Sequence, residues 1–155
     1  MEKAYDKLEW DFLFACLTQM GFHHRWIAWV KECITKVSYS LLINNTSHGL
    51  FKPSRGLRQG DPLSPYLFIL CMNAFWAALC NLANTPKSGV GVRLSAHSPI
   101  IPYLFFADDS LLFCKTSTSA CTNLKLVIDK FCQLSGQVIN FHKSSIVTSK
   151  NASHA

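Results

Sequence analysis

The stretch that decides the fold is YLFFADDSLLFC, residues 103–114. Two apolar, aromatic-rich runs of strand length flank a pair of adjacent carboxylates, Asp108 and Asp109. Such runs, separated by only a few small or polar residues, predict a β-hairpin with both acids at or beside its turn. Adjacent like charges repel, and a hard cation such as Mg²⁺ relieves the repulsion by binding carboxylate oxygens. Taken alone, the stretch also fits an ordinary Asp-Asp turn.

The composition indicates one folded domain. The chain has 155 residues, of which 49% are hydrophobic, so it can bury a single core and is not a disordered tail. The net charge of +6 is compatible with a polyanionic partner and also with a solvated basic surface. Seven cysteines lie singly, without a C-x-x-C pair, which disfavours a zinc site and indicates a reduced intracellular protein.

One apolar segment raises the question of a membrane span. Residues 66–80 are almost wholly apolar and are interrupted only by Asn73. Their length, about 15 residues, is short of the roughly 20 that a spanning helix needs. Pro62 and Pro65 stand where the first turn of a soluble helix tolerates proline. We therefore expect a buried core helix and no membrane partner.

The remaining pattern predicts alternating helices and short strands. Apolar residues recur at helical spacing over 9–20, 23–37, 63–83 and the segment that ends at Gly136. Strands are expected at 38–43, 50–52, 100–106 and 146–148, with a weak one at 90–94 and a turn over 44–49. These elements predict an α+β fold in which helices cover one face of an antiparallel sheet.

Four motifs, in order, resemble those of reverse transcriptases. Phe106-Ala107-Asp108-Asp109 is similar to the family's [FY]-x-D-D signature, and residues 53–65 are similar to its substrate-pocket motif. Residues 2–6 look like the tail of the first palm motif, and residues 135–144 look like the segment after the second palm helix. The resemblance is to the non-LTR (LINE-type) retrotransposon branch, of plant type. It implies a partial palm domain over residues 1–150 and a polar tail over 151–155.

The resemblance also implies a reaction, RNA-directed DNA synthesis. A primer 3′-hydroxyl attacks the α-phosphate of a deoxynucleoside triphosphate, assisted by two Mg²⁺ (or Mn²⁺) ions about 3.5–4 Å apart. Asp108 is the better candidate for a direct metal ligand, and Asp109 is the second acid of the pair. Lys143 matches a lysine that protonates the pyrophosphate leaving group, although an exposed lysine without a role fits the sequence as well.

Four residues are expected to contact the nucleotide. Tyr5 matches the aromatic residue that packs under the sugar and obstructs a 2′-hydroxyl, or else it is a core tyrosine at a strand end. Gln59 lies near the sugar and base in the family, and Gly60 permits close approach of the backbone. Arg58 pairs with phosphates or makes a surface salt bridge. Asp61 is expected to cap the next helix and not to bind metal.

The first palm motif is expected to be incomplete in this chain. The family's first catalytic Asp would fall immediately before Met1, so we expect weak metal binding and no polymerisation by the chain alone. Its partners would be an RNA template, a DNA primer, deoxynucleoside triphosphates and the rest of a retrotransposon polyprotein, in the nucleus or cytoplasm. The alternative function is a noncatalytic nucleic-acid-binding remnant or a functionless truncated gene copy.

Overall fold

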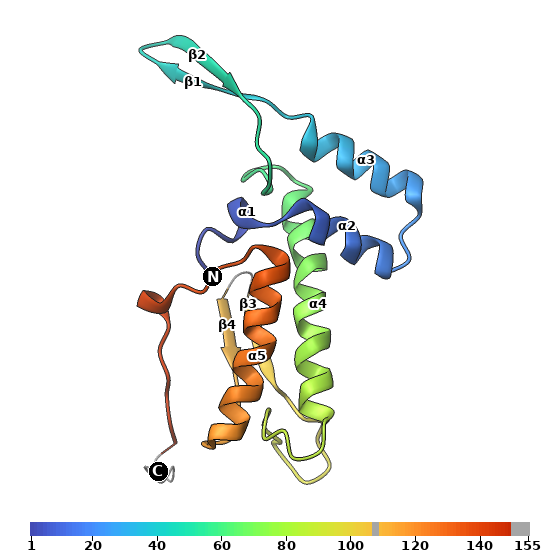
Figure 1. The fold of residues 1–155 in the computed structure, drawn as a ribbon, viewed down its shortest axis with the longest axis vertical. Helices are drawn as coiled ribbons and strands as arrows, with labels where there is room; N and C mark the ends of the chain where they lie inside the picture. Colours follow the sequence, from blue (N-terminus) through green and yellow to red (C-terminus); the bar gives the residue numbers. More distant parts are fainter. Residues whose placement is uncertain (107–108, 150–155) are drawn as a thin grey trace.

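The computed structural model describes residues 1–106 and 109–149. In chain order the helices and strands are α1 (Ala4–Lys7), α2 (Trp10–Gln19), α3 (His24–Thr35), β1 (Tyr39–Ile43), β2 (Thr46–Phe51), α4 (Ser64–Asn84), β3 (Tyr103–Phe106), β4 (Asp109–Leu112), α5 (Thr118–Ser135) and the 3₁₀ turn η1 (Phe141–Lys143). Helices α4 and α5 run side by side next to the β3–β4 hairpin, while α3 and the β1–β2 hairpin project at one end (Figure 1). The fold is therefore mixed α and β, as predicted.

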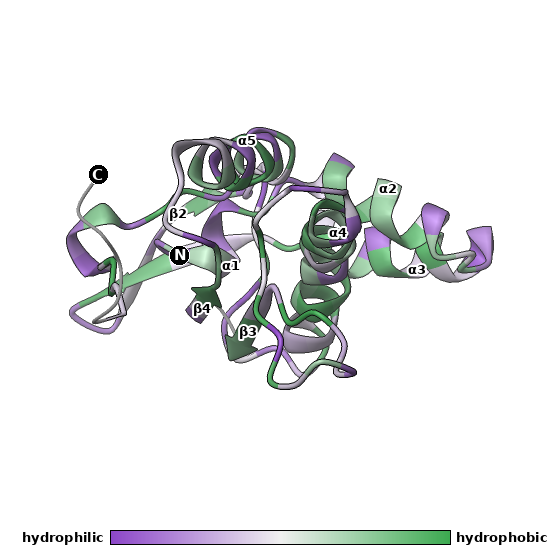
Figure 2. Ribbon diagram, turned by 90° about the horizontal axis from the view of Figure 1, so that it is seen from below, coloured by the Kyte–Doolittle hydropathy of each residue, from purple (hydrophilic) through white to green (hydrophobic). Residues whose placement is uncertain are grey.

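Helix α4 is the centre of the core. Its side chains Leu67, Phe68 and Leu79 are at most 1% exposed, and α2 and α5 both pack against it. The ring of Phe75 stacks on Phe131 of α5 at 4.5 Å and on Phe105 of β3 at 5.5 Å between centroids. Viewed from below, α4 is the most continuously hydrophobic element (Figure 2). Helix α4 thus packs against both the neighbouring helix α5 and the hairpin formed by β3 and β4.

The β3–β4 hairpin has one packed face and one open face. Tyr103 and Phe105 point to the core cluster, whereas Leu104 and Phe106 are 56% and 84% exposed. This alternation is the period of two expected of a half-buried strand. The prediction that helices cover one face of a sheet holds for the β3–β4 hairpin. The prediction of one sheet was wrong within the described residues, where β1–β2 and β3–β4 form two separate two-stranded sheets.

The β1–β2 hairpin has a shorter turn than predicted. Asn44 and Asn45 take left-handed backbone conformations, with φ of 48° and 61°, and Ile43 pairs directly with Thr46. Two consecutive positive φ angles are those of the two-residue type I′ turn, in which Asn is favoured. The second strand therefore begins at Thr46, and the predicted six-residue turn followed by a strand over 50–52 was wrong.

The predicted start and burial of α4 also need correction. Asp61 Oδ1 accepts a hydrogen bond of 2.8 Å from the backbone N–H of Leu63, so Asp61 caps the turn that precedes the helix and not its N-terminus. Only one stripe of α4 is buried. Tyr66 and Trp76, both in the segment 66–80 that was predicted to be buried, are 68% and 46% exposed. By length and hydropathy α4 is the one described helix that resembles a membrane span, with 39% of its most apolar window buried.

Two predicted strands did not form as such in the described residues. Ile146 and Val147 are 94% and 90% exposed, and the segment around them is extended without a strand partner. β-Branched residues favour strands only where a neighbour pairs with them. The weak strand over 90–94 is reduced to two isolated bridges, Val90 with Cys114 and Val92 with Ile101.

Candidate active site

The loop that carries Arg58 and Gln59 is fastened to the N-terminal segment. The backbone N–H of Leu57 donates to the carbonyl of Tyr5 at 2.8 Å, and the N–H of Gly56 donates to that of Leu8 at 2.8 Å. The indole Nε1 of Trp10 donates to the Gly56 carbonyl at 2.7 Å. Segments about 50 residues apart are thus joined, because these buried or half-buried backbone groups find their partners in each other.

Gly56 has a specific reason to be glycine. Its φ is +86°, and a Cβ atom at this position would lie 2.7 Å from the carbonyl oxygen of Asp6. Backbone atoms cannot yield to such a contact as a flexible side-chain end can, so any larger residue would push the loop away from Asp6. The close approach brings two polar side chains of the sequence motifs, Asp6 and Gln59, to one place.

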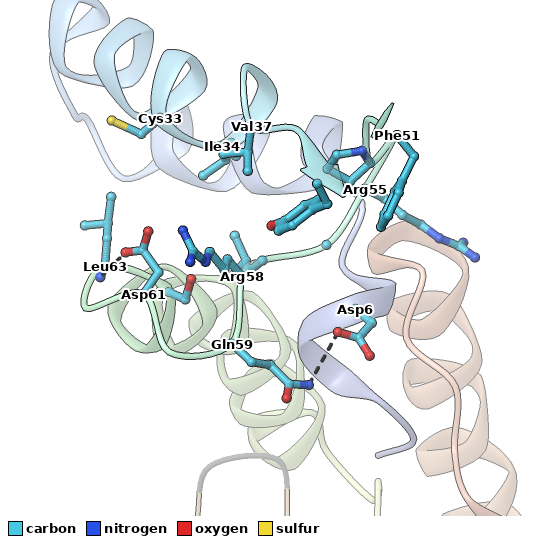
Figure 3. A pocket seen from close by; sticks show the side chains of 15 residues that line it. Asp6, Cys33, Ile34, Val37, Phe51, Arg55, Arg58, Gln59, Asp61 and Leu63 are labelled. Atoms are coloured by element: carbon cyan, nitrogen blue, oxygen red, sulfur yellow. Dashed lines mark hydrogen bonds between the residues drawn. The ribbon is translucent and has the colours of Figure 1, made fainter. Parts of the chain in front are cut away.

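A cavity of about 520 Å³ opens between this loop, α3 and the base of the β1–β2 hairpin (Figure 3). Its polar lining includes Asp6, Arg58, Gln59 and Asp61, and its apolar lining includes Ile34, Val37, Tyr39 and Phe51. Gln59 Nε2 donates a long hydrogen bond of 3.4 Å to Asp6 Oδ1, shown dashed in Figure 3. Of the residues predicted to bind substrate, Arg58 and Gln59 line this cavity, and Tyr5 and Gly60 are not among its lining residues.

The two arginines of the loop have different surroundings. Arg55 Nη1 lies 3.1 Å from Glu9 Oε1, with both side chains about half exposed. Within the described part of the chain, Arg58 has neither an ion pair nor a side-chain hydrogen bond and is exposed. Arg55 is therefore engaged in a surface ion pair, while the guanidinium of Arg58 remains able to bind an anion.

Tyr5 lies where α1, α4 and the loop that carries Arg58 meet. Its ring stacks on Phe68 of α4, with 5.0 Å between centroids and 20° between ring planes. Its carbonyl accepts the hydrogen bond from Leu57 described above. The side chain is only partly buried, so one ring face packs on the core while part of the residue is accessible. This geometry is compatible with either predicted role, a core tyrosine or a surface for a sugar ring.

Asp109, the second acid of the pair, lies at the start of the second strand of the β3–β4 hairpin. Asp109 is the first residue of β4, pairs with Phe106 and is exposed. Asp108, the better candidate metal ligand, lies outside the described residues. Asp109 lines a shallow hollow of about 320 Å³ together with Leu104 and Ser110. Its carboxylate is the hard oxygen donor that Mg²⁺ prefers. In residues 1–106 and 109–149 no cluster of three or more acidic, His or Cys side chains could hold a metal ion.

Lys143 and two other polar residues complete the comparison with the sequence. Lys143 ends η1, is exposed, and lines neither of the two hollows. Asp6, which the sequence placed in the first motif without a role in binding, lines the larger cavity and accepts a hydrogen bond from Gln59. Gln137 was part of a motif without a role of its own, yet its buried amide donates to the carbonyl of Ala4 at 2.8 Å. The only advance signal for these two was their place inside a motif.

Comparison with known proteins settles the family. The family model described as "Reverse transcriptase (RNA-dependent DNA polymerase)" matches residues 1–154. The chain belongs to the reverse transcriptase family. The palm-like fold that this family implies is consistent with the helices and antiparallel hairpins described above.

The relatives are polyproteins of mobile elements. The chain is 30% identical over 146 residues to the retrovirus-related Pol polyprotein of a type-2 R2 retrotransposable element of Drosophila melanogaster, covering 92% of this chain and 13% of that protein. It is 40% identical over 90 residues to the corresponding type-1 R2 polyprotein of Popillia japonica, covering 58% and 12%. The predicted non-LTR type is thereby confirmed.

A shorter relative comes from a plant. The chain is 54% identical over 69 residues to an uncharacterized mitochondrial protein of Arabidopsis thaliana, covering 44% of this chain and 56% of that protein. The reverse transcriptase chain therefore spans little more than half of one relative and about an eighth of the polyproteins.

Proposed function

We propose that residues 1–150 form the palm of an RNA-directed DNA polymerase from a plant-type non-LTR retrotransposon, which adds deoxynucleotides to a DNA primer on an RNA template. The observation that carries this proposal is the attachment of the Arg58–Gln59 loop to the Tyr5–Asp6 segment, with the Arg58 guanidinium, unpaired among the described residues, in the lining of the adjacent cavity. A triphosphate is the polyanion that a free guanidinium binds with charge-assisted hydrogen bonds. The identity with R2 polyproteins supports the same reaction class.

Each proposed residue has a distinct task. Arg58 binds the triphosphate, and Gln59, whose amide both donates and accepts, binds the sugar or base. Gly60, with φ of +88° and open space around it, lets backbone approach the nucleotide. Tyr5 obstructs a 2′-hydroxyl, and Lys143 supplies a proton to the leaving pyrophosphate. We place these tasks on the motif positions that the family shares.

The acid pair would hold the divalent metal. Asp109 offers an exposed carboxylate at the start of β4, and Asp108 precedes it in the sequence. The hard oxygen donors of this pair fit Mg²⁺ or Mn²⁺, which when bound stabilises the charge that develops on the attacking and leaving oxygens. Two carboxylates supply only part of the oxygen shell that such an ion takes, so without further carboxylates we expect them to bind metal weakly.

The nucleotide site can be tested on the chain itself. Replacing Arg58 with Ala should weaken binding of a deoxynucleoside triphosphate about tenfold, as expected for loss of one charge-assisted hydrogen bond. Isothermal titration calorimetry at fixed ionic strength measures the dissociation constant. The matched control is Arg93→Ala, because Arg93 is engaged with the carbonyl of Ser98 at 2.9 Å and does not line the cavity. Equal dissociation constants for wild type and Arg58→Ala would remove Arg58 from the site.

Catalysis by the isolated chain is a separate question. We expect the purified 155-residue protein not to extend a primer on an RNA template, because its acid pair alone holds the metal weakly. Primer extension with Mg²⁺ or Mn²⁺, followed on a denaturing gel, measures this. Extension that disappears in Asp108→Asn would contradict the expectation and assign the activity to this chain. The outcome does not affect the nucleotide-binding test.

A further inference from the structure

Gln137 is a buried polar residue, and the residues next to it in the sequence do not explain its burial. The residue is 2% exposed and follows directly after Gly136, the C-cap of α5. Its Nε2 donates a hydrogen bond of 2.8 Å to the backbone carbonyl of Ala4, a residue 133 positions earlier. Its Oε1 is buried and has no hydrogen-bond partner among the described residues. A side-chain amide that is buried with one of its two polar atoms unbonded lowers the stability of the fold. A contribution to stability therefore does not by itself explain why a glutamine is buried here.

The hydrogen bond is part of a wider attachment between the two ends of the chain. The N–H of Glu2 donates to the carbonyl of Val138, and the N–H of Glu9 donates to that of Ser135, both at 2.9 Å. Gln137 lies between these two backbone bonds and reaches the peptide that joins Ala4 to Tyr5. Three hydrogen bonds therefore hold residues 2–9 against the segment after α5, and the middle bond is made by the side chain of Gln137.

The position of Tyr5 depends on the hydrogen bond from Gln137 to the Ala4 carbonyl. Its ring is limited on one side by Phe68 at 5.0 Å, and its own carbonyl is held by the Leu57 N–H. Tyr5 lies in the single helical turn α1, Ala4–Lys7. The hydrogen bond from Gln137 to the Ala4 carbonyl fixes that turn against the segment after α5, and so restricts movement of the Tyr5 ring along Phe68. We propose that Gln137 is a positioning residue that fixes the backbone of Tyr5, and through it the discrimination between deoxyribose and ribose.

This inference rests on the proposed function of Tyr5, and one substitution separates positioning from plain stability. Gln137→Met keeps the length and volume of the side chain but removes both the donor and the unsatisfied acceptor. Loss of the hydrogen bond lowers the stability of the fold, and removal of the buried, unbonded acceptor raises it. The two effects offset each other, so the midpoint of thermal unfolding should stay within about 3 °C of wild type. A residue whose role is only structural would leave Tyr5 and sugar selectivity unchanged in that variant.

Two measurements on the 155-residue chain decide the matter. The first is the NMR chemical shift of the Tyr5 ring, which senses Phe68 and should change in Gln137→Met. The second is the ratio of the dissociation constants for a ribonucleoside and a deoxyribonucleoside triphosphate, which should fall at least about twofold in Gln137→Met and further in Tyr5→Ala. The control is Gln133→Met, the same substitution at an exposed position of α5, which should change neither.

The outcomes are distinguishable. Shifted Tyr5 resonances and a reduced ratio in Gln137→Met, with neither in Gln133→Met, support the inference. Unchanged resonances and an unchanged ratio overturn it. If wild type and Tyr5→Ala bind both nucleotides equally, the proposed role of Tyr5 has failed, and the Tyr5 resonances alone then decide whether Gln137 holds that backbone.

Discussion

Gly136 is the position at which α5 meets the N-terminal segment without room for a side chain. Its φ is +74°, and a Cβ would lie 2.5 Å from the Lys7 carbonyl oxygen and 2.7 Å from Cγ of Glu9. Gly21 also has a positive φ, of +80°, but no atom of the described part of the chain lies within 4 Å of the place a Cβ would take. The two glycines thus share the backbone conformation and differ only in crowding.

This pair of glycines gives a matched prediction. Gly21→Ala should lower the free energy of unfolding by about 1 kcal/mol, the cost of a left-handed alanine. Gly136→Ala should lower it by about 2–3 kcal/mol, because the contact with backbone adds to the same conformational cost. Urea unfolding followed by circular dichroism measures both. Equal losses would show that the crowding at Gly136 is relieved without cost.

At single residues, the sequence indicates candidate residues but not their contacts. Arg58 and Gln59, two candidates from the motif over residues 53–65, line one cavity. The hydrogen bonds from Gln59 to Asp6 and from Gln137 to Ala4 span 53 and 133 positions and could not be predicted, because no local pattern encodes a partner so distant. Local chemistry can show that an amide has donors and acceptors, but the fold decides where they point.

At the scale of the elements, prediction succeeded where local signals coincide. Helix α5 has an amphipathic period, a polar cluster before it and Gly136 after it, and the structure places its caps at Ser117 and Gly136. The expected strand over 146–148 had β-branched residues alone and found no pairing partner among the described residues. The expected long turn after β1 failed because Asn44 and Asn45 close the hairpin in two residues. A strand depends on its partner, which a one-dimensional pattern does not contain.

The N-cap of α5 offers a test at the same scale. The side chain of Ser117 accepts a hydrogen bond of 3.3 Å from the N–H of Ala120, satisfying one donor of the first helical turn. Ser117→Ala should therefore lower the free energy of unfolding by about 1 kcal/mol. Ser119→Ala, two residues into the helix and exposed, should cost little because Ala is a better helix former. Thermal unfolding compares the two variants, and an equal loss in both would contradict the cap.

For the whole molecule, seven cysteines act as reporters of burial. None is paired in a disulfide; Cys16 and Cys71 are buried between α2 and α4, while Cys33 and Cys121 are exposed. The hydrogen bond to Cys16, together with burial, raises the pKa of the Cys71 thiol. Burial, with the neighbouring Cys121, raises the pKa of Cys114. Because the thiolate is the reactive form, a raised pKa slows alkylation at any pH below it.

Alkylation of the native chain should follow this order and report on the site. At pH 8, iodoacetamide should modify Cys33 and Cys121 first and Cys71 only on unfolding, as mass spectrometry of timed digests would show. Cys33 also lines the cavity that contains Arg58, so a bound deoxynucleoside triphosphate should slow its modification and leave that of Cys121 unchanged. Urea provides the control in which all seven thiols react. Native Cys71 reacting as fast as Cys121 would contradict the packing of α2 on α4, and nucleotide slowing both exposed thiols alike would contradict a local binding site.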